Sequence, residues 1–370
     1  MSQPIEYKGC NYLKQRLLLS TLSGKSLKIT DIRANKDDPG VRAFEVNLIA
    51  LLEKLSNGMK VKFNETGTNL RYDPGMLIGG DLVHECNIER GIGYYLEAVM
   101  ILAPFCKNPV KIKLKGITET CLDPSIDRIK AAGLPVLKKF FTGDSDNIKI
   151  TIVKRGIAPN GGGEVHFECP VVRFLKPVYF IEIGSLKRIR GVACSMRVAG
   201  DRAVIVAKSV KEKLWEHIQK RDTDINIMAD PCRKEKSGNS PGFAITLNAE
   251  TTTGVILSAQ ACSSKEKNDP EEVGKEAALK LLDELYRNGC VDSVFQSMAI
   301  IFMALNRRDV SKMIVGPLTQ SAIQTLRDLK DFFSVVFKLD YHKDEDGNNL
   351  EQVVLLCMGI EYSNLSKRLL

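Results

Sequence analysis

Hydrophobic and polar positions follow the same order in three parts of the chain. The segments Leu18 to Ile29, Ile101 to Ile112 and Ile301 to Val315 each close an apolar helix, turn through polar residues and enter a strand. A helical pattern and then two strand-like patterns follow each segment. The sequence therefore predicts three helix–strand–helix–strand–strand units that pack with pseudo-threefold symmetry around one core. These units span about 9–75, 92–176 and 287–360.

The spacing of the three units indicates an insertion. Leu18 and Ile101 lie 83 positions apart, whereas Ile101 and Ile301 lie 200 positions apart. The surplus is enough for a small domain, and its pattern also alternates between strands and helices. The predicted fold class is α/β (α+β). A large domain at 1–182 and 287–370 is interrupted by a small α/β domain at 183–286.

Composition limits the function classes. The 370 residues carry a formal net charge of +8, which mildly favours a polyanionic partner. The ten cysteines are dispersed without any C-x-x-C pair, which is typical of reduced, intracellular core residues and argues against disulfides and zinc. We expect no metal site. No apolar run approaches the ~18 residues of a membrane span, so we expect no membrane partner.

Basic residues gather at a few positions that could bind RNA phosphates. The alternative is ordinary solvated surface charge. Aromatic residues make up only 6% of the chain, so base stacking of the kind used by single-strand readers is not indicated. The candidates for RNA or anion binding are Lys14, Arg16, Arg155, Lys187, Arg188, Arg190, Arg307 and Arg308.

A glycine-rich stretch, "RGIAPNGGGEV", carries the most specific signal. Alone, its glycines and arginine are typical of a phosphate cradle. Between two predicted strands, they indicate a tight bend. The stretch fits R-G-x-x-P-x-G-G-G-x-V, and with the repeated architecture it resembles the RNA 3′-terminal phosphate cyclase family. The signature residues are Arg155, Gly156, Pro159, Gly161, Gly162 and Gly163.

The resemblance implies an ATP-dependent activity that this chain does not support. Cyclases of the family adenylate a histidine near the C-terminus and pass AMP to an RNA 3′-phosphate. The matching segment here, "VGPLTQSAIQTL", places Gln320 or Ser321 at that position. Neither side chain replaces a nucleophilic imidazole. We therefore expect no cyclase activity and no cofactor.

The segments "CNYLKQRL", "PGMLIGG" and "RGIGYYLE" resemble a eukaryotic branch of the family without cyclase activity. That resemblance implies a ribosome biogenesis factor in the nucleus, specifically the nucleolus. Its partners would be a ribosome-assembly GTPase, the snoRNP-containing small-subunit processome and pre-rRNA. It would support the early cleavages that lead to 18S rRNA.

Two other functions stay open at this point. Arg327 and Lys330 are three positions apart on a predicted helix, next to the lost histidine, and with Asp328 as a base they could form a pre-rRNA endonuclease. The alternative is a solvated amphipathic helix, since Leu326 and Leu329 supply an apolar stripe. The remaining function is a residual ATP-dependent cyclase with a relocated nucleophile.

Overall fold

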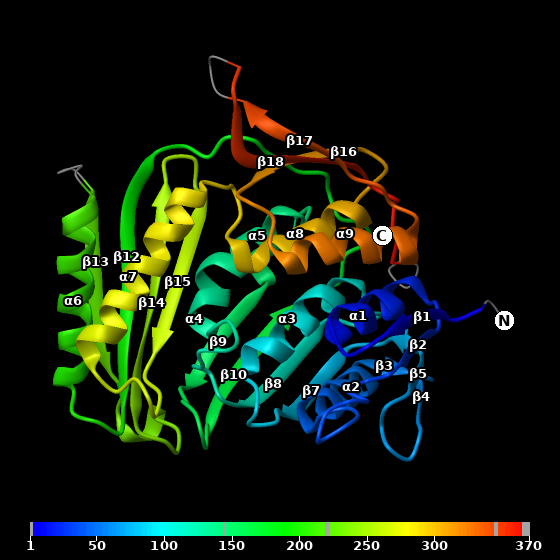
Figure 1. Ribbon diagram of the computed structural model, residues 1–370, viewed down its shortest axis with the longest axis horizontal. Helices are drawn as coiled ribbons and strands as arrows, with labels where there is room; N and C mark the ends of the chain where they lie inside the picture. The colour runs from blue at the N-terminus through cyan, green and yellow to red at the C-terminus, as the bar shows by residue number, and fades with distance from the viewer. Residues whose placement is uncertain (1–2, 144, 219–222, 344–346, 365–370) are drawn as a thin grey trace.

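The computed structural model describes residues 3–143, 145–218, 223–343 and 347–364. Three of its four-stranded sheets share one topology. Across each of them, the strands of one repeat lie in the chain order first, second, fourth, third, and the first strand is parallel to the second while the other pairs are antiparallel. Figure 1 shows the three sheets around a set of central helices. The fold class predicted from the repeats is confirmed as a mixed α/β structure.

Each repeat contains one more strand than the sequence predicted, because a short strand precedes its first helix. In the first repeat the elements are β1 (Ile5–Lys8), α1 (Leu13–Ser23), β2 (Leu27–Thr30), α2 (Ala43–Leu55), β4 (Lys60–Phe63) and β5 (Leu70–Asp73). The second repeat has β7 (Gly80–Glu85), α3 (Ile92–Leu102), β8 (Val110–Gly116), α4 (Ile126–Arg128), α5 (Leu134–Lys139), β9 (Lys149–Lys154) and β10 (Gly163–Cys169). The third has β11 (Tyr179–Phe180), α8 (Gln296–Leu305), β16 (Val310–Val315), α9 (Gln320–Phe333), β17 (Lys338–Lys343) and β18 (Asn349–Met358).

The smaller elements complete the described chain. They are β3 (Ser56–Asn57) paired with β6 (Met76–Leu77), and the short helices η1 (Ala103–Phe105), η2 (Ile129–Gly133), η3 (Ser145–Asn147), η4 (Lys234–Lys236) and η5 (Ser293–Phe295). Among the described residues, no helix combines the length and the apolar character that crossing a bilayer requires.

The insertion interrupts the third repeat rather than preceding it. Tyr179 and Phe180 of β11 pair in parallel with Lys312 and Met313 of β16, so the third sheet begins before the inserted segment. The two-residue strand is too short for a sequence pattern to reveal. The limits 183 and 286 of the small domain remain a proposal, supported by a separate hydrophobic core built from residues between 186 and 285.

The inserted unit is a sheet covered differently on its two faces. Its elements are β12 (Leu186–Met196), α6 (Asp201–His217), β13 (Asp224–Pro231), β14 (Gly242–Thr251), β15 (Ile256–Cys262) and α7 (Pro270–Arg287). Ile245, Leu247 and Ala261 face a core shared with α6 and α7. Because strand side chains alternate between faces, Thr246 and Gln260 point the other way, and both bond to the second repeat.

The central helices explain why the three repeats form one body. Helix α8 is buried at every position except Ser297, and α3 is buried at every position except Glu97. Helices that are apolar on all sides belong inside a core. One continuous hydrophobic cluster runs from Leu13 in the first repeat to Cys357 in the third.

The glycine-rich signature lies at the junction between the second repeat and the inserted unit. It connects β9 to β10, as expected for a bend, and its backbone bonds to residues 236–240 of the inserted unit. The Arg155 amide donates to the carbonyl oxygen of Lys236 at 2.9 Å, and the Asn239 amide donates to the carbonyl oxygen of Gly161 at 2.8 Å. A Cβ atom on Gly162 would lie 2.8 Å from the Asn239 side chain. These glycines let two backbones approach each other.

Replacing Gly161 with alanine tests whether the bend needs glycine where it packs against the end of β8. Gly161 has a φ of +53°, and a Cβ atom there would lie 2.8 Å from the carbonyl oxygen of Gly116. We expect Gly161→Ala to lower the free energy of unfolding by about 2–4 kcal/mol, because left-handed strain adds to a backbone clash. Gly254→Ala is the control, since Gly254 has a φ of +79° and open space around it; about 1–2 kcal/mol is expected. Equal urea midpoints for the two variants would contradict the assignment.

Candidate functional site

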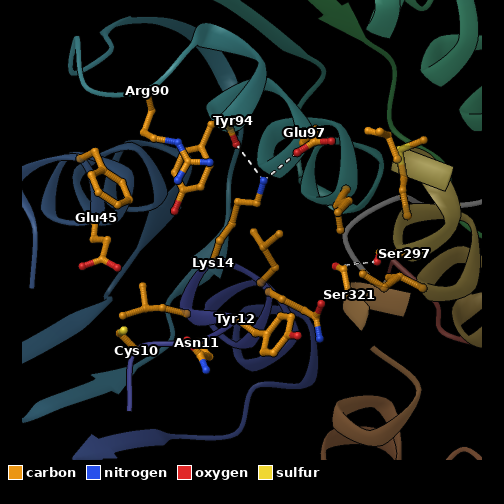
Figure 2. Close-up of a pocket in the computed structure, with 18 of the residues that line it drawn as sticks. Cys10, Asn11, Tyr12, Lys14, Glu45, Arg90, Tyr94, Glu97, Ser297 and Ser321 are labelled. Atoms are coloured by element: carbon orange, nitrogen blue, oxygen red, sulfur yellow. Dashed lines mark hydrogen bonds and ion pairs between the residues drawn. The ribbon is translucent and has the colours of Figure 1, made fainter. Parts of the chain in front are cut away.

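The two residues that the sequence analysis assigned to the family's histidine position begin helix α9. Thr319 caps this helix by accepting a hydrogen bond from the Ala322 amide at 3.1 Å. Gln320 and Ser321 follow it, and both are exposed. The Ser321 hydroxyl lies 2.9 Å from the hydroxyl of Ser297 on α8. Ser321 therefore reaches the edge of a cleft of about 400 Å³ between the helices (Figure 2).

The cleft collects polar side chains from all three repeats. Its lining includes Asn11, Tyr12, Lys14, Glu45, Tyr94 and Glu97. The Lys14 ammonium donates to a Glu97 carboxylate oxygen at 2.7 Å and to the carbonyl oxygen of Tyr94 at 3.4 Å, as Figure 2 shows. The charge of Lys14 is thus balanced inside the cleft. Of the predicted anion-binding residues, it alone lines this space within the described residues.

Two arginines at the cleft are also held by carboxylates. Arg33 forms a two-pronged ion pair with Glu45, with nitrogen–oxygen distances of 2.7 and 2.8 Å. The hydrogen bond to Glu45 raises the pKa of Arg33. The Glu45 carboxylate also accepts from the Arg42 amide at 2.8 Å, so it holds the start of α2 as well.

Arg90 is fixed from three sides. Its Nε donates to Asp123 at 2.9 Å, and its guanidinium carbon lies 4.2 Å from the centre of the Tyr94 ring and 5.2 Å from that of Phe44. Cations over aromatic faces gain electrostatic attraction. Both arginines at the cleft thus already have a carboxylate partner, and with Lys14 they form a set of internal ion pairs.

Comparison with known proteins matches this architecture to one family. The family model for RNA 3'-terminal phosphate cyclase matches residues 5–339. The chain is 46% identical to the RNA 3'-terminal phosphate cyclase-like protein of Homo sapiens over 370 residues, covering 99% of this chain and 98% of that protein. The chain belongs to the RNA 3′-terminal phosphate cyclase family. It is 43% identical to a probable cyclase-like protein of Drosophila melanogaster over 377 residues, with 98% and 97% covered. It is also 39% identical to the rRNA processing protein rcl1 of Schizosaccharomyces pombe over 366 residues, with 98% of each covered.

Because cyclases of this family use a histidine, we located the described histidines relative to the cleft. No described histidine lines the cleft. His84 is buried on β7, a strand that the sequence showed only as a glycine-rich segment, and its Nε2 lies 3.0 Å from the Asn47 side-chain oxygen. Burial lowers the pKa of His84 to about 4, so its imidazole is neutral at pH 7. Within the described residues, no cluster of metal-ligating side chains is present either.

Arg155 of the family signature is an internal cation. Only 13% of its side chain is exposed, and its guanidinium bonds to Asp127, with Glu119 at 3.8 Å and Asp230 at 3.9 Å. Asp127 and Glu119 belong to the second repeat, and Asp230 to β13 of the inserted unit. The structure therefore gives Arg155 carboxylate partners on both sides of this junction, and binding of an RNA phosphate by Arg155 stays a prediction.

Arg16 is also buried, on the side of α1 that faces α9. Its guanidinium carbon lies 3.9 Å from the centre of the Tyr7 ring, and its Nε lies 3.8 Å from Asp328. Like Arg155, it is enclosed rather than presented to solvent.

The other predicted basic residues lie away from the cleft. Arg188 pairs with Glu250, and Arg190 pairs with Asp224, so each is bound within the inserted sheet. Lys187, Arg307 and Arg308 are exposed. These three remain available for a polyanion, although the structure does not bring Lys187 next to the two arginines between α8 and β16.

The proposed nuclease residues do not share a face of α9. Arg327 and Lys330 are exposed, whereas Asp328 is fully buried. The Asp328 carboxylate accepts from the side-chain amide of Gln15 at 2.6 Å and from that of Gln324 at 2.7 Å. Burial raises the pKa of Asp328 above its ordinary value. Asp328 joins α9 to α1 and does not face a space that an RNA could enter with Arg327 and Lys330.

Single substitutions separate a structural role of Asp328 from a catalytic one. We expect Asp328→Ala to lower the free energy of unfolding by about 3 kcal/mol, because Arg16 and Gln15 lose a buried partner. Arg327→Ala and Lys330→Ala should change it by less than about 0.5 kcal/mol, since both side chains are exposed. Urea unfolding of the three variants measures the difference. Similar stability of Asp328→Ala and the wild type would contradict this assignment.

Proposed function

We propose that this chain is a non-cyclase factor for ribosomal RNA processing. The observation that carries the proposal is the likeness over nearly the whole chain to a relative named as an rRNA processing protein. It fits our assignment of Gln320 and Ser321 to the position of the family's histidine, and Ser321 lines the cleft. The paired cations support a structural role for the cleft. The chain then acts by binding partners and RNA on its surfaces.

In this proposal the chain works in the nucleolus as part of the small-subunit processome. It binds a ribosome-assembly GTPase, joins the snoRNP-containing assembly and supports the early pre-rRNA cleavages that lead to 18S rRNA. The net charge of +8 and the exposed Lys187, Arg307 and Arg308 suit a surface that contacts pre-rRNA directly or lies beside it. Phosphate contacts of this kind give affinity without sequence readout.

The absence of cyclase chemistry is tested by labelling. Purified full-length protein is incubated with radiolabelled ATP and an RNA that ends in a 3′-phosphate. We expect no covalent AMP on the denatured protein and no cyclic phosphate on the RNA, because none of the described imidazoles lines the cleft to attack ATP. A histidine-containing cyclase of the family is the positive control. Covalent AMP on this chain would overturn the non-cyclase assignment.

The role in rRNA processing is tested by depletion and rescue in cells. Depletion should lower mature 18S rRNA and accumulate uncleaved precursor, while large-subunit rRNA is kept. Ser321→Ala should rescue as well as the wild type, because its hydroxyl performs no chemistry. Northern blots and pulse labelling measure both effects. Unchanged 18S rRNA after depletion would sink the processing role, whereas a stable Ser321→Ala protein that fails to rescue would sink only the non-catalytic assignment.

A further inference from the structure

Two cysteines face each other across the junction between the second repeat and the inserted unit. Cys121 lies in the loop that follows β8, and Cys262 is the last residue of β15. Their sulfur atoms are 2.6 Å apart, and both thiols are free. A disulfide bond is about 2.05 Å long. A small movement is therefore enough to bring the two sulfurs to bonding distance.

The loop around Cys121 is clamped to the strand that carries Cys262. Gln260 lies two residues before Cys262 and so shares its face of the sheet. Its amide donates to the carbonyl oxygens of Thr120 at 3.0 Å and Asp123 at 2.8 Å. Its oxygen accepts from the Ser125 amide at 2.6 Å. These bonds hold the loop on both sides of Cys121, so the approach of the two thiols is fixed by the fold.

The surroundings give the two thiols different roles. Cys121 is exposed, whereas Cys262 is buried. A hydrogen bond from Cys262 is the main influence that lowers the pKa of the Cys121 thiol, and the same bond and burial raise the pKa of Cys262. Two charged side chains of α7 act on Cys121 in opposite directions: Lys280 lowers its pKa and Glu276 raises it. An exposed thiolate beside a second thiol is the arrangement of an attacking and a resolving cysteine.

We propose that Cys121 and Cys262 form a reversible disulfide by exchange with a small-molecule disulfide such as oxidised glutathione. The Cys121 thiolate attacks one glutathione sulfur, forming a mixed disulfide and releasing one glutathione thiolate. The Cys262 sulfur then attacks the Cys121 sulfur and releases the second. Two protein thiols are oxidised to one disulfide, one glutathione disulfide is reduced to two thiols, and the two protons lost by the cysteines go to the released thiolates.

The bond would add a covalent link where hydrogen bonds and ion pairs otherwise hold the junction. Dispersed cysteines in the sequence gave no sign of it, because the pair is brought together only by docking of the inserted unit. In a reducing compartment the pair stays as thiols. Oxidation would fix the inserted unit covalently against the second repeat, and reduction would leave it held by the non-covalent contacts alone.

The test is direct identification of the bond in the full-length protein. Reduced protein is incubated with oxidised glutathione, remaining thiols are blocked with N-ethylmaleimide, and the digest is analysed by mass spectrometry. We expect the peptide that contains Cys121 to be joined to the peptide that contains Cys262. The thermal midpoint should rise by about 5 °C relative to reduced protein and return with dithiothreitol.

Variants give the control. Cys121→Ser and Cys262→Ala should each abolish the link and the shift of the midpoint, and Cys121→Ser keeps the buried core intact. Cys232→Ser is matched to them, because Cys232 is a half-buried thiol in the same region of the inserted unit; it should leave both unchanged. A stable glutathione adduct on Cys121, a link to another cysteine, or no oxidation of the pair would each overturn the proposal.

Discussion

An ion pair between Arg128 and Asp292 lies where the second repeat, the third repeat and the inserted unit meet. Arg128 belongs to the second repeat and Asp292 to the start of the third, and their nitrogen and oxygen atoms lie 2.9 Å apart. Ser258 of the inserted unit completes the group: its amide donates to Asp292 at 3.0 Å, and its carbonyl oxygen accepts from Arg128 at 2.7 Å. Desolvating two charges is costly unless every remaining polar atom is satisfied. The pair is therefore stable only when all three parts are docked together.

The same requirement accounts for the ion pairs that line the cleft. Buried or half-buried cations need fixed partners, and here Glu45, Glu97 and Asp123 supply them. Asp292 also positions one wall of the cleft. Its carboxylate accepts from the Val294 amide at 2.8 Å and so caps η5, directly before α8. Ser297 on α8 then meets Ser321 of α9. The geometry around Ser297 and Ser321 is thus maintained by charge pairing and helix capping.

The sequence was sufficient for the repeats, the α/β class and the bend at the glycines, because these depend on local periodicity and on residues adjacent in the chain. It was insufficient for Arg155, whose partners Asp127 and Asp230 lie on other elements. Strand β11 was missed because two residues carry no period. Asp328 shows most clearly what the sequence could not predict. Helical spacing correctly makes Arg327 and Lys330 neighbours on α9. Which face of α9 is buried depends on contacts of Asp328 with Gln15 and Arg16 of a distant helix.

The place of the insertion links the junction with the second repeat to the stability of the third sheet. Because β11 precedes the inserted unit and β16 follows it, the parallel pair in the third sheet closes a loop that spans 181–309. Closing such a loop costs conformational entropy that a two-residue strand cannot offset alone. Contacts of the inserted unit with the second repeat, through the glycine-rich bend, Gln260 and Arg128, hold the two ends near each other and reduce that cost. A loss of contacts at this junction should therefore also weaken the parallel pair of β11 and β16 in the third sheet.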